Sequence, residues 1–386
     1  GGFFCLHPAS GQQHFHCDVI RDALWQLKTG GIRHRARADF RQRKSCMLGR
    51  QYHVTGQRQL QPTPTADAVH RSDHRLVHTA QFLQPTKASD PIITIHRVAV
   101  CGSDQPPFCG VHEVYPQPIG TTGHEGMGIV EACPSGRYKK GERVLLWGFD
   151  RGLFQEYVLA TDSGGCIRLP TDLPEEKVLM SQLLGTVIHS FYKIGNIIDQ
   201  DVVVIGQGPV GLLFDAVLRN LGARRIIALD KLDYRLDVGR QIGATHVVNS
   251  ARQDPAAIVA SITDGAMADL VIEAVGITET LNLVPSLCRR NAQVICFGVP
   301  DKEHCEGIYN VRVLDMLRQE LRLIFSVGPN PNRDYRPALD WIVQERIDVG
   351  PIVSHILPFD QIQQAFTMAF DDPEPHQALK IVLNFT

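Results

Sequence analysis

An apolar run followed at once by three spaced glycines constrains this chain more than any other feature. Residues 202–205 read Val-Val-Val-Ile, residues 206–211 read Gly-Gln-Gly-Pro-Val-Gly, and an apolar stretch then begins Leu212-Leu-Phe. A short apolar run bounded by glycine predicts a buried strand, and the longer stretch after it predicts a helix. The segment therefore predicts a strand, a tight turn and a helix packed against each other.

The same alternation continues through the second half of the chain. Further apolar runs occupy residues 226–229, 246–248, 270–272 and 294–297, with helical stretches between them. Runs of this kind are buried on both faces, as a parallel sheet requires. We expect a doubly wound α/β sheet.

The glycine motif in this position predicts a dinucleotide site. Gly206 gives the tight turn, Gly208 lets the backbone approach the pyrophosphate, and Gly211 allows close helix packing, with Pro209 and Val210 between them. Asp230 ends the next strand, where a carboxylate accepts hydrogen bonds from both ribose hydroxyls. It favours NAD over NADP, although the adjacent Lys231 leaves use of both open.

The middle of the chain has a different character. Residues 92–100 form a strand-like segment, and short apolar pieces follow at 129–130, 144–147 and 157–159, each close to glycine or proline. This pattern is typical of a compact, partly open β-barrel.

Composition favours small-molecule chemistry. There are 39 basic and 41 acidic residues, and no apolar run reaches the length of a membrane span, so we expect no nucleic-acid or membrane partner. The ten cysteines are scattered without a Cys-x-x-Cys pair, which favours a reducing, cytoplasmic setting.

Residues 1–80 differ from the rest. The first glutamate of the chain is Glu113, half of the 16 histidines lie in this stretch, and no apolar periodicity runs through it. We expect an atypical N-terminal extension, either disordered or an organelle-targeting segment.

Two fragments upstream of the glycine motif carry metal-ligand chemistry. Cys101-Gly-Ser103-Asp follows one predicted strand, and Gly-His124-Glu125 opens another. Thiolate, imidazole and carboxylate together are the ligands of a catalytic zinc with one position left open to substrate.

These motifs resemble the zinc-containing medium-chain alcohol dehydrogenase family, and most closely its polyol and threonine dehydrogenase branch. The similarity lies in Cys-Gly-Ser-Asp, Gly-His-Glu-x-x-Gly-x-Val, Gly-Glu-Arg-Val at 141–144, the glycine motif and residues 242–249, in that order. It covers roughly residues 90–386. It implies a GroES-like, partly open β-barrel catalytic domain at 81–190 and 336–386, and a Rossmann NAD-binding domain at 191–335.

The resemblance also implies a site. Cys101 and His124 match two ligands of the catalytic zinc, and Glu125 matches a residue that in some members binds the metal. The remaining family ligand, Cys or Glu, falls on Gln182, and a neutral amide is a poorer zinc ligand. Either Glu125 completes the set or zinc is held weakly. Asp104 orients a ligand rather than binding the metal itself.

Two other departures from the family pattern concern a second, structural zinc and the relay of the substrate proton. Residues 144–157 leave no room for the four-cysteine lobe of many relatives, so we expect one catalytic and no structural zinc. A relay histidine of the family is replaced by Pro106. The resemblance further implies that Thr186, Val275 and Val299 line the nicotinamide pocket and that Arg235 contacts the adenosine side.

The implied reaction is hydride transfer from a secondary alcohol or polyol to NAD(+), with zinc lowering the pKa of the substrate hydroxyl and Ser103 accepting its proton. Two alternatives stay open: a zinc-free reductase of enones or quinones, and a non-catalytic nucleotide-binding protein. We expect a homodimer or homotetramer.

Overall fold

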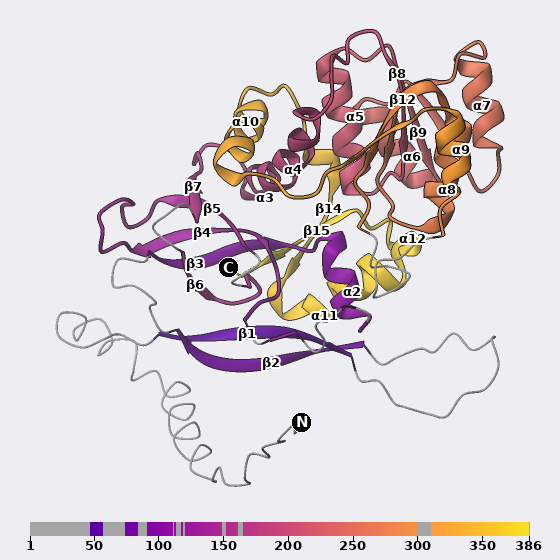
Figure 1. Cartoon of the computed structure of the whole chain (residues 1–386). Helices are drawn as coiled ribbons and strands as arrows, with labels where there is room; N and C mark the ends of the chain where they lie inside the picture. The colour runs from indigo at the N-terminus through magenta and orange to yellow at the C-terminus, as the bar shows by residue number, and fades with distance from the viewer. Residues whose placement is uncertain are drawn as a thin grey trace, which may run out of the picture. The chain divides into compact units, whose positions relative to one another are not determined.

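The computed structural model describes residues 47–56, 74–83, 91–110, 112, 117–118, 120–148, 152–160, 165–299 and 310–385. The chain divides into two units, Gly1–Met47 and Leu48–Thr386, and the second contains nearly all of the described residues. Its described part contains two large sheets and one two-stranded sheet (Figure 1).

One large sheet has six parallel strands in the order β10-β9-β8-β11-β12-β13 within the described residues. The chain enters it at its centre and winds outward in both directions, as a doubly wound fold does. Its strands are β8 (Asp201–Ile205), β9 (Arg225–Asp230), β10 (His246–Asn249), β11 (Ala268–Glu273), β12 (Cys288–Cys296) and β13 (Arg322–Phe325).

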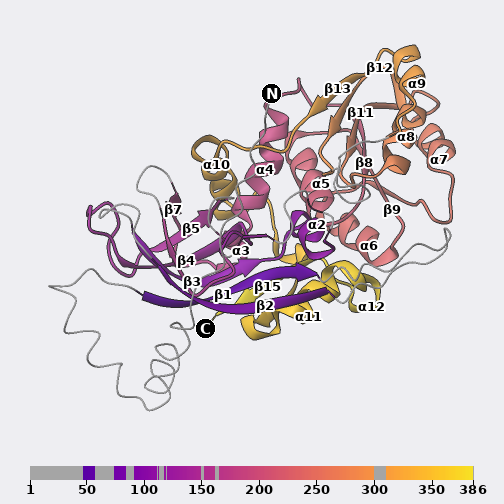
Figure 2. The same cartoon turned by 60° about the horizontal axis from the view of Figure 1, so that its bottom comes forward.

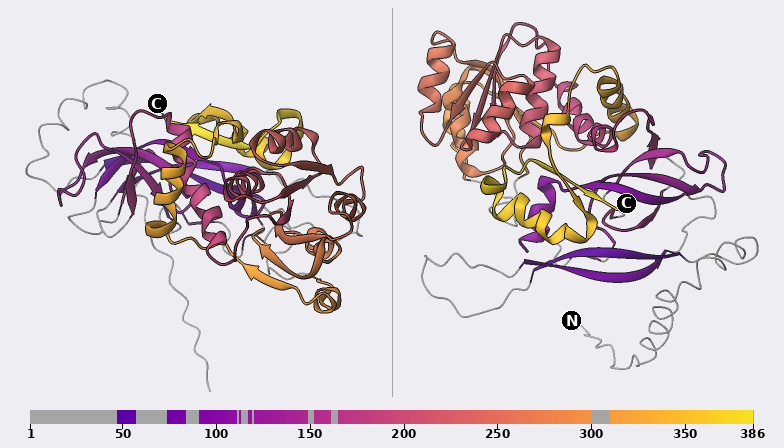
Figure 3. Two further views of the ribbon diagram at one scale, coloured as in Figure 1. Left: turned by 90° about the horizontal axis from the view of Figure 1, so that it is seen from above. Right: turned by 180° about the vertical axis from the view of Figure 1, so that it is seen from behind.

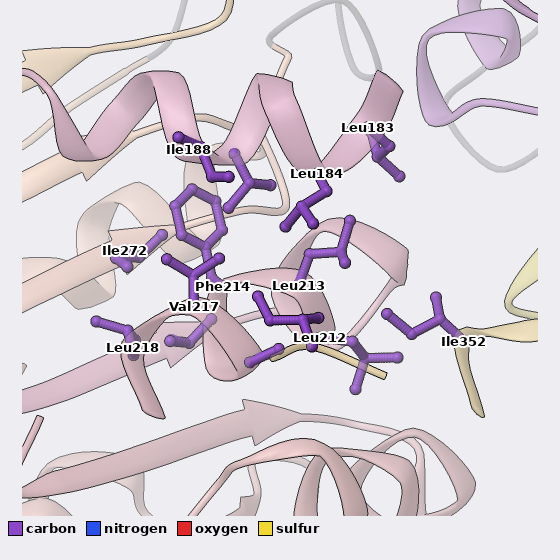
Figure 4. Close-up of a cluster of buried hydrophobic side chains, with 14 of the residues drawn as sticks. Leu183, Leu184, Ile188, Leu212, Leu213, Phe214, Val217, Leu218, Ile272 and Ile352 are labelled. Atoms are coloured by element: carbon purple, nitrogen blue, oxygen red, sulfur yellow. The ribbon is translucent and has the colours of Figure 1, made fainter. Parts of the chain in front are cut away.

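Each inner strand of this sheet is buried on both faces. Val202 and Val204 pack into one hydrophobic cluster, and Val203 and Ile205 pack into another on the opposite face. In Figure 4, Leu184 and Ile188 of one helix face Leu213 and Phe214 of the helix that follows the glycine motif. These contacts hold the glycine-rich turn between rigid elements.

The other large sheet is mixed. Within the described residues its order is β14-β15-β3-β4-β5-β7, with β6 also paired to β3. Its strands are β3 (Ile92–Ala99), β4 (Glu125–Ala132), β5 (Arg143–Trp147), β6 (Tyr157–Leu159), β7 (Cys166–Arg168), β14 (Val353–Pro358) and β15 (Lys380–Asn384). The C-terminal strand β15 runs antiparallel to β3, and Figure 3 shows this yellow segment beside the purple strands.

Helices cover both sheets, and α4 and α10 lie side by side (Figure 2). The described α-helices are α2 (Gln105–Phe108), α3 (Glu175–Leu179), α4 (Ser181–Phe191), α5 (Pro209–Leu221), α6 (Asp233–Ile242), α7 (Pro255–Ile262), α8 (Thr278–Leu287), α9 (Val313–Arg318), α10 (Pro331–Val343), α11 (Ile362–Phe366) and α12 (Pro373–His376). The α/β class, with a GroES-like partly open barrel and a Rossmann sheet, is confirmed.

Most of residues 1–80 lies outside the described residues. Two strands, β1 (Met47–Gly56) and β2 (His74–Leu83), form the two-stranded sheet in a region to which the sequence assigned no fold. Histidine, arginine and glutamine interrupt the apolar residues of β2, so no alternation of apolar and polar residues marks it as a strand. Among the described helices, none combines the length and apolar character needed to cross a membrane.

Candidate metal and dinucleotide site

Three potential metal ligands converge at one end of the mixed sheet. The ligand atoms of Cys101, His124 and Glu125 all lie within 4.8 Å of one another. Strands β3 and β4 are antiparallel, with Val98 opposite Gly126, so residues just after β3 meet residues at the start of β4. The strand register therefore brings together residues that are distant in sequence.

The turn after β3 orients the site. Residues Gly102–Asp104 form a short 3-10 helix, and Asp104 Oδ2 accepts a hydrogen bond from Cys101 N at 2.9 Å. Asp104 Oδ1 lies 3.7 Å from His124 Nδ1, which leaves His124 Nε2 facing the cluster. Burial raises the pKa of Asp104 above its usual range. Asp104 therefore holds both the Cys101 backbone and the His124 ring.

The hydroxyl of Ser103 sits directly on the ligand pair. Ser103 Oγ donates to Cys101 Sγ at 3.4 Å and lies 3.2 Å from His124 Nε2. A hydroxyl there is within reach of any atom bound by the thiolate and the imidazole. The structure thus places a proton carrier beside the candidate ligands.

The electrostatic character of the cluster suits a cation. Burial lowers the pKa of His124, but the neighbouring Cys101 thiolate and the carboxylates of Asp104 and Glu125 outweigh it and raise that pKa to about 10. A buried group of acidic side chains stabilises positive charge. A divalent metal supplies such charge.

Glu125 is held from behind by a buried lysine. Lys380 Nζ lies 2.6 Å from Glu125 Oε2 and donates to Val100 O at 3.1 Å. Glu125 Oε1 is buried and has no hydrogen-bond partner within the described residues. One carboxylate oxygen is thus fixed by Lys380, and the other is free to bind a metal.

Gln182 lies at the start of α4, and its buried amide is fixed by Tyr335 of α10. Gln182 Nε2 donates to the Tyr335 hydroxyl at 3.1 Å, and Tyr335 packs edge-on against Trp147. Gln182 Oε1 has no hydrogen-bond partner in the described part of the chain. The thiolate, the imidazole and the unpaired oxygen of Glu125 fit zinc, a metal bound by sulfur, nitrogen and oxygen donors, and Gln182 Oε1 is a further buried oxygen without a partner among the described residues.

The three glycines of the turn after β8 have distinct roles. Gly206 has a φ of 92°, a conformation that favours glycine. A Cβ on Gly211 would overlap the carbonyl oxygen of Gly206, whereas a Cβ on Gly208 would meet nothing within 4 Å. Pro209 begins α5, with Val210 next to it. The turn leaves open space at a helix N-terminus, the geometry that binds a pyrophosphate.

Asp230 lies beside this turn. Its carboxylate accepts from Gln207 N at 2.7 Å and from Leu232 N at 3.0 Å, and Arg235 Nη1 lies 3.8 Å away. The Lys231 ammonium is 3.1 Å from Glu279 and so is already paired. Asp230 and Arg235 are therefore adjacent at the carboxyl end of β9.

The predicted nicotinamide-side residues lie on two touching loops and one helix. Glu273 Oε1 accepts from the backbone N of Val275 and of Gly276, each at 2.9 Å. A Cβ on Gly276 would overlap the carbonyl oxygen of Val299, so the two loops are in close contact. Thr186 donates from Oγ1 to Gln182 O within α4 at 3.1 Å.

Sequence reasoning missed the roles of Lys380 and Tyr335. Lys380 is the one charged residue in the run from Ala378 to Leu383, and a lone lysine inside an apolar strand indicates a buried partner. Tyr335 carries no comparable signal, because a tyrosine in an amphipathic helix is most often a core residue.

Comparison with known proteins places these features in a family. Residues 87–171 match a family model described as "Alcohol dehydrogenase GroES-like domain", and residues 209–344 match "Zinc-binding dehydrogenase". An L-threonine 3-dehydrogenase of Caldanaerobacter subterraneus subsp. tengcongensis is 30% identical over 248 residues, 64% of this chain and 70% of the relative. One from Bacillus licheniformis is 27% identical over 61% of this chain and 67% of its own length.

Solved structures show the same fold. L-idonate 5-dehydrogenase from Escherichia coli superposes with a TM-score of 0.73 at 18% identity, covering 88% of this chain and 99% of its own. Galactitol-1-phosphate dehydrogenase from Escherichia coli gives a TM-score of 0.68 at 21% identity, covering 81% and 96%. With the family models and the threonine dehydrogenase relatives, they show that this chain is a dehydrogenase that belongs to the zinc-containing medium-chain alcohol dehydrogenase family, polyol and threonine branch.

Proposed function

We propose that this enzyme oxidises a secondary alcohol or polyol by hydride transfer to NAD(+), at one catalytic zinc held by Cys101, His124 and Glu125. The proposal rests on the convergence of these three ligand atoms within 4.8 Å. The Ser103 hydroxyl also contacts two of them, Cys101 Sγ at 3.4 Å and His124 Nε2 at 3.2 Å. The zinc-binding family and the threonine dehydrogenase relatives support it.

Zinc, when bound, supplies a Lewis acid that polarises the substrate hydroxyl and lowers its pKa. The chain's own residues handle the proton. Ser103 Oγ, in hydrogen-bonding contact with Cys101 Sγ and His124 Nε2, accepts the substrate proton as its own hydroxyl proton passes to solvent. Asp104 keeps the His124 ring in place while this happens.

NAD rather than NADP is the proposed acceptor. Asp230 presents a carboxylate where the adenosine ribose is expected, and it repels a 2′-phosphate. Lys231 does not offset this charge, because Glu279 pairs with it. We also propose that no structural zinc is present, because residues 144–157 leave no room for a four-cysteine lobe, and that the enzyme is cytoplasmic.

A substrate panel with matched variants tests the proposal. Secondary alcohols, polyols and 3-hydroxy amino acids are assayed separately with NAD(+) and NADP(+), using wild type, Ser103→Ala and Ser135→Ala. We expect one of these classes to reduce NAD(+) and Ser103→Ala to lower kcat about 100-fold or more. Ser135, exposed on the turn after the far end of β4, serves as control. Equal rates for both serine variants would contradict the role of Ser103.

We propose that the enzyme is a homo-oligomer that pairs through β13. This strand ends the order of the parallel sheet within the described residues, and Leu323, Phe325 and Val327 are exposed there. An exposed apolar strand edge is self-complementary about a two-fold axis, so a second copy is the proposed occupant.

Light scattering of wild type, Phe325→Glu and Ile198→Glu tests this interface. Ile198 is a matched control because it is also an exposed apolar residue but lies next to Gly222, at the C-terminal end of α5, rather than on β13. We expect a dimer or tetramer that only Phe325→Glu dissociates. A monomeric wild type, or unchanged mass for Phe325→Glu, would contradict the interface.

A further inference from the structure

Directly beneath the glycine-rich turn lies a buried polar pair. Gln207, between Gly206 and Gly208, and Asp215, in the middle of α5, are both completely buried. Their four side-chain oxygen and nitrogen atoms have no partner at hydrogen-bonding geometry within the described residues. A polar pair of this kind costs stability unless its members satisfy each other.

The two side chains converge on one point of the neighbouring helix. A Cβ on Gly239 of α6 would lie 2.7 Å from Gln207 Oε1 and 3.5 Å from Asp215 Oδ2. Gln207 Nε2 lies near Gly211 on the other side. The absence of side chains at Gly239 and Gly211 makes the space in which the amide and the carboxyl group meet.

Among the described residues, no cation acts on Asp215. Of the charged residues on α5 and α6, Arg219, Asp233, Asp237 and Arg240 are exposed, and the partly buried Arg235 lies 3.8 Å from Asp230 instead. Burial raises the pKa of Asp215 well above its ordinary value, and the hydrogen-bonding influence of Gln207 lowers that pKa only in part. A neutral carboxyl group can donate from its O–H to Gln207 Oε1 and accept from Gln207 Nε2. Two reciprocal bonds of that kind satisfy both groups.

The pair bears on the dinucleotide site through Gln207. The backbone N of Gln207 donates to Asp230 Oδ2 at 2.7 Å, so this residue joins α5 to the proposed ribose-binding carboxylate. Asp215 lies six residues after Pro209, about 9 Å along the helix from the N-terminus that would face the pyrophosphate. An ionised Asp215 would therefore oppose a bound dinucleotide and leave Gln207 Oε1 without a donor.

We propose that Asp215 is a positioning residue, a carboxylic acid held neutral and paired with Gln207, that fixes the glycine-rich turn in the shape that binds the dinucleotide. The pairing itself needs no bound cofactor. The consequence for cofactor affinity rests on the proposed dinucleotide site.

Infrared difference spectroscopy tests the pairing without cofactor. Wild type and Asp215→Asn are compared at neutral pH, with Asp237→Asn as control. Asn has nearly the same shape as Asp and keeps one hydrogen-bond donor and one acceptor toward Gln207. We expect a protonated-carboxyl band in wild type and Asp237→Asn that Asp215→Asn lacks. Identical protonated-carboxyl bands in all three proteins would overturn the proposal.

NADH titration across pH tests the consequence for binding. We expect Asp215→Asn to bind NADH within about threefold of wild type at neutral pH, and Gln207→Leu to raise Kd about tenfold or more, about 1.4 kcal/mol. Wild-type affinity should fall as pH rises through the folded pKa of Asp215, and Asp215→Asn should not follow it. Equal pH dependence in wild type and Asp215→Asn would overturn the positioning role. If no variant binds NADH while the infrared difference persists, the dinucleotide site fails and the pairing stands.

Discussion

Lys380 Nζ lies 2.6 Å from Glu125 Oε2, and both side chains are almost completely buried, at 1% and 2% exposed. The C-terminal strand β15 thus supports a candidate zinc ligand on β4 through an ion pair behind the site. Desolvation lowers the pKa of Lys380, but the attraction of Glu125 outweighs it and raises that pKa above its ordinary value. Lys380 is therefore charged at neutral pH and cancels part of the negative charge of the site.

Removal of Lys380 should destabilise the protein strongly. Lys380→Met leaves Glu125 buried without its cation, which costs about 3–5 kcal/mol of the free energy of unfolding. Denaturant unfolding of Lys380→Met, Glu125→Gln and the double variant measures the coupling. We expect the double variant to lose clearly less than the sum of the single losses. Additive losses would show that the two side chains do not depend on each other.

Two glycine substitutions should separate folding from cofactor binding. Gly208→Ala should unfold at the same temperature as wild type, because its Cβ meets open space, yet weaken NADH binding about tenfold or more by occupying the pyrophosphate position. Gly211→Ala should lower the unfolding temperature, because its Cβ overlaps the Gly206 carbonyl. Calorimetry and NADH titration of both variants test this. If Gly208→Ala bound NADH as tightly as wild type, the pyrophosphate would not bind at this turn.

Much of this site could be predicted from local sequence. The buried runs at 202–205 and 226–229 fix the parallel strands, and the spacing of Gly206, Gly208 and Gly211 locates the turn between strand and helix. Cys101 lies just after β3 and His124 just before β4, so the antiparallel pairing of these two strands brings the residues together. These signals come from residues that are close in sequence, so the spacing of apolar residues and glycines is enough to predict them.

The remaining parts depend on packing between distant segments. Lys380 meets Glu125 only because β15 returns to pair with β3, and Tyr335 meets Gln182 only because α10 lies against α4. The Asp215 and Gln207 pair depends on the absence of a side chain at Gly239, a residue on another helix. No local sequence pattern indicates which distant residue each of these side chains contacts.

Cofactor preference should respond to Asp230. Asp230→Asn removes the charge that repels a 2′-phosphate and leaves Arg235, 3.8 Å away in the wild type, free to attract it. We expect the ratio of kcat/KM for NADP(+) to that for NAD(+) to rise about tenfold or more, a shift of about 1.4 kcal/mol. Asp233→Asn, three residues along, is the control. The same ratio in Asp230→Asn and wild type would place the ribose elsewhere.

Gln182 should limit zinc affinity. Its amide oxygen is unpaired and buried, and a carboxylate in the same place would add the anionic ligand that many relatives carry. Gln182→Glu should therefore hold zinc about tenfold more tightly in competition with a chelator. Tyr335→Phe, which removes only the hydroxyl bonded to Gln182, should change zinc affinity less. No gain in Gln182→Glu would mean that this side chain does not reach the metal.

The zinc content of the purified protein is a direct test of the proposed site at Cys101, His124 and Glu125. Elemental analysis of wild type, Cys101→Ser, His124→Ala and the control Cys133→Ser is combined with alcohol-dependent NAD(+) reduction by each preparation. We expect about one zinc per chain in wild type and Cys133→Ser, and loss of both zinc and activity in the two ligand variants. A metal-free wild type that reduces enones with a nicotinamide cofactor would contradict it.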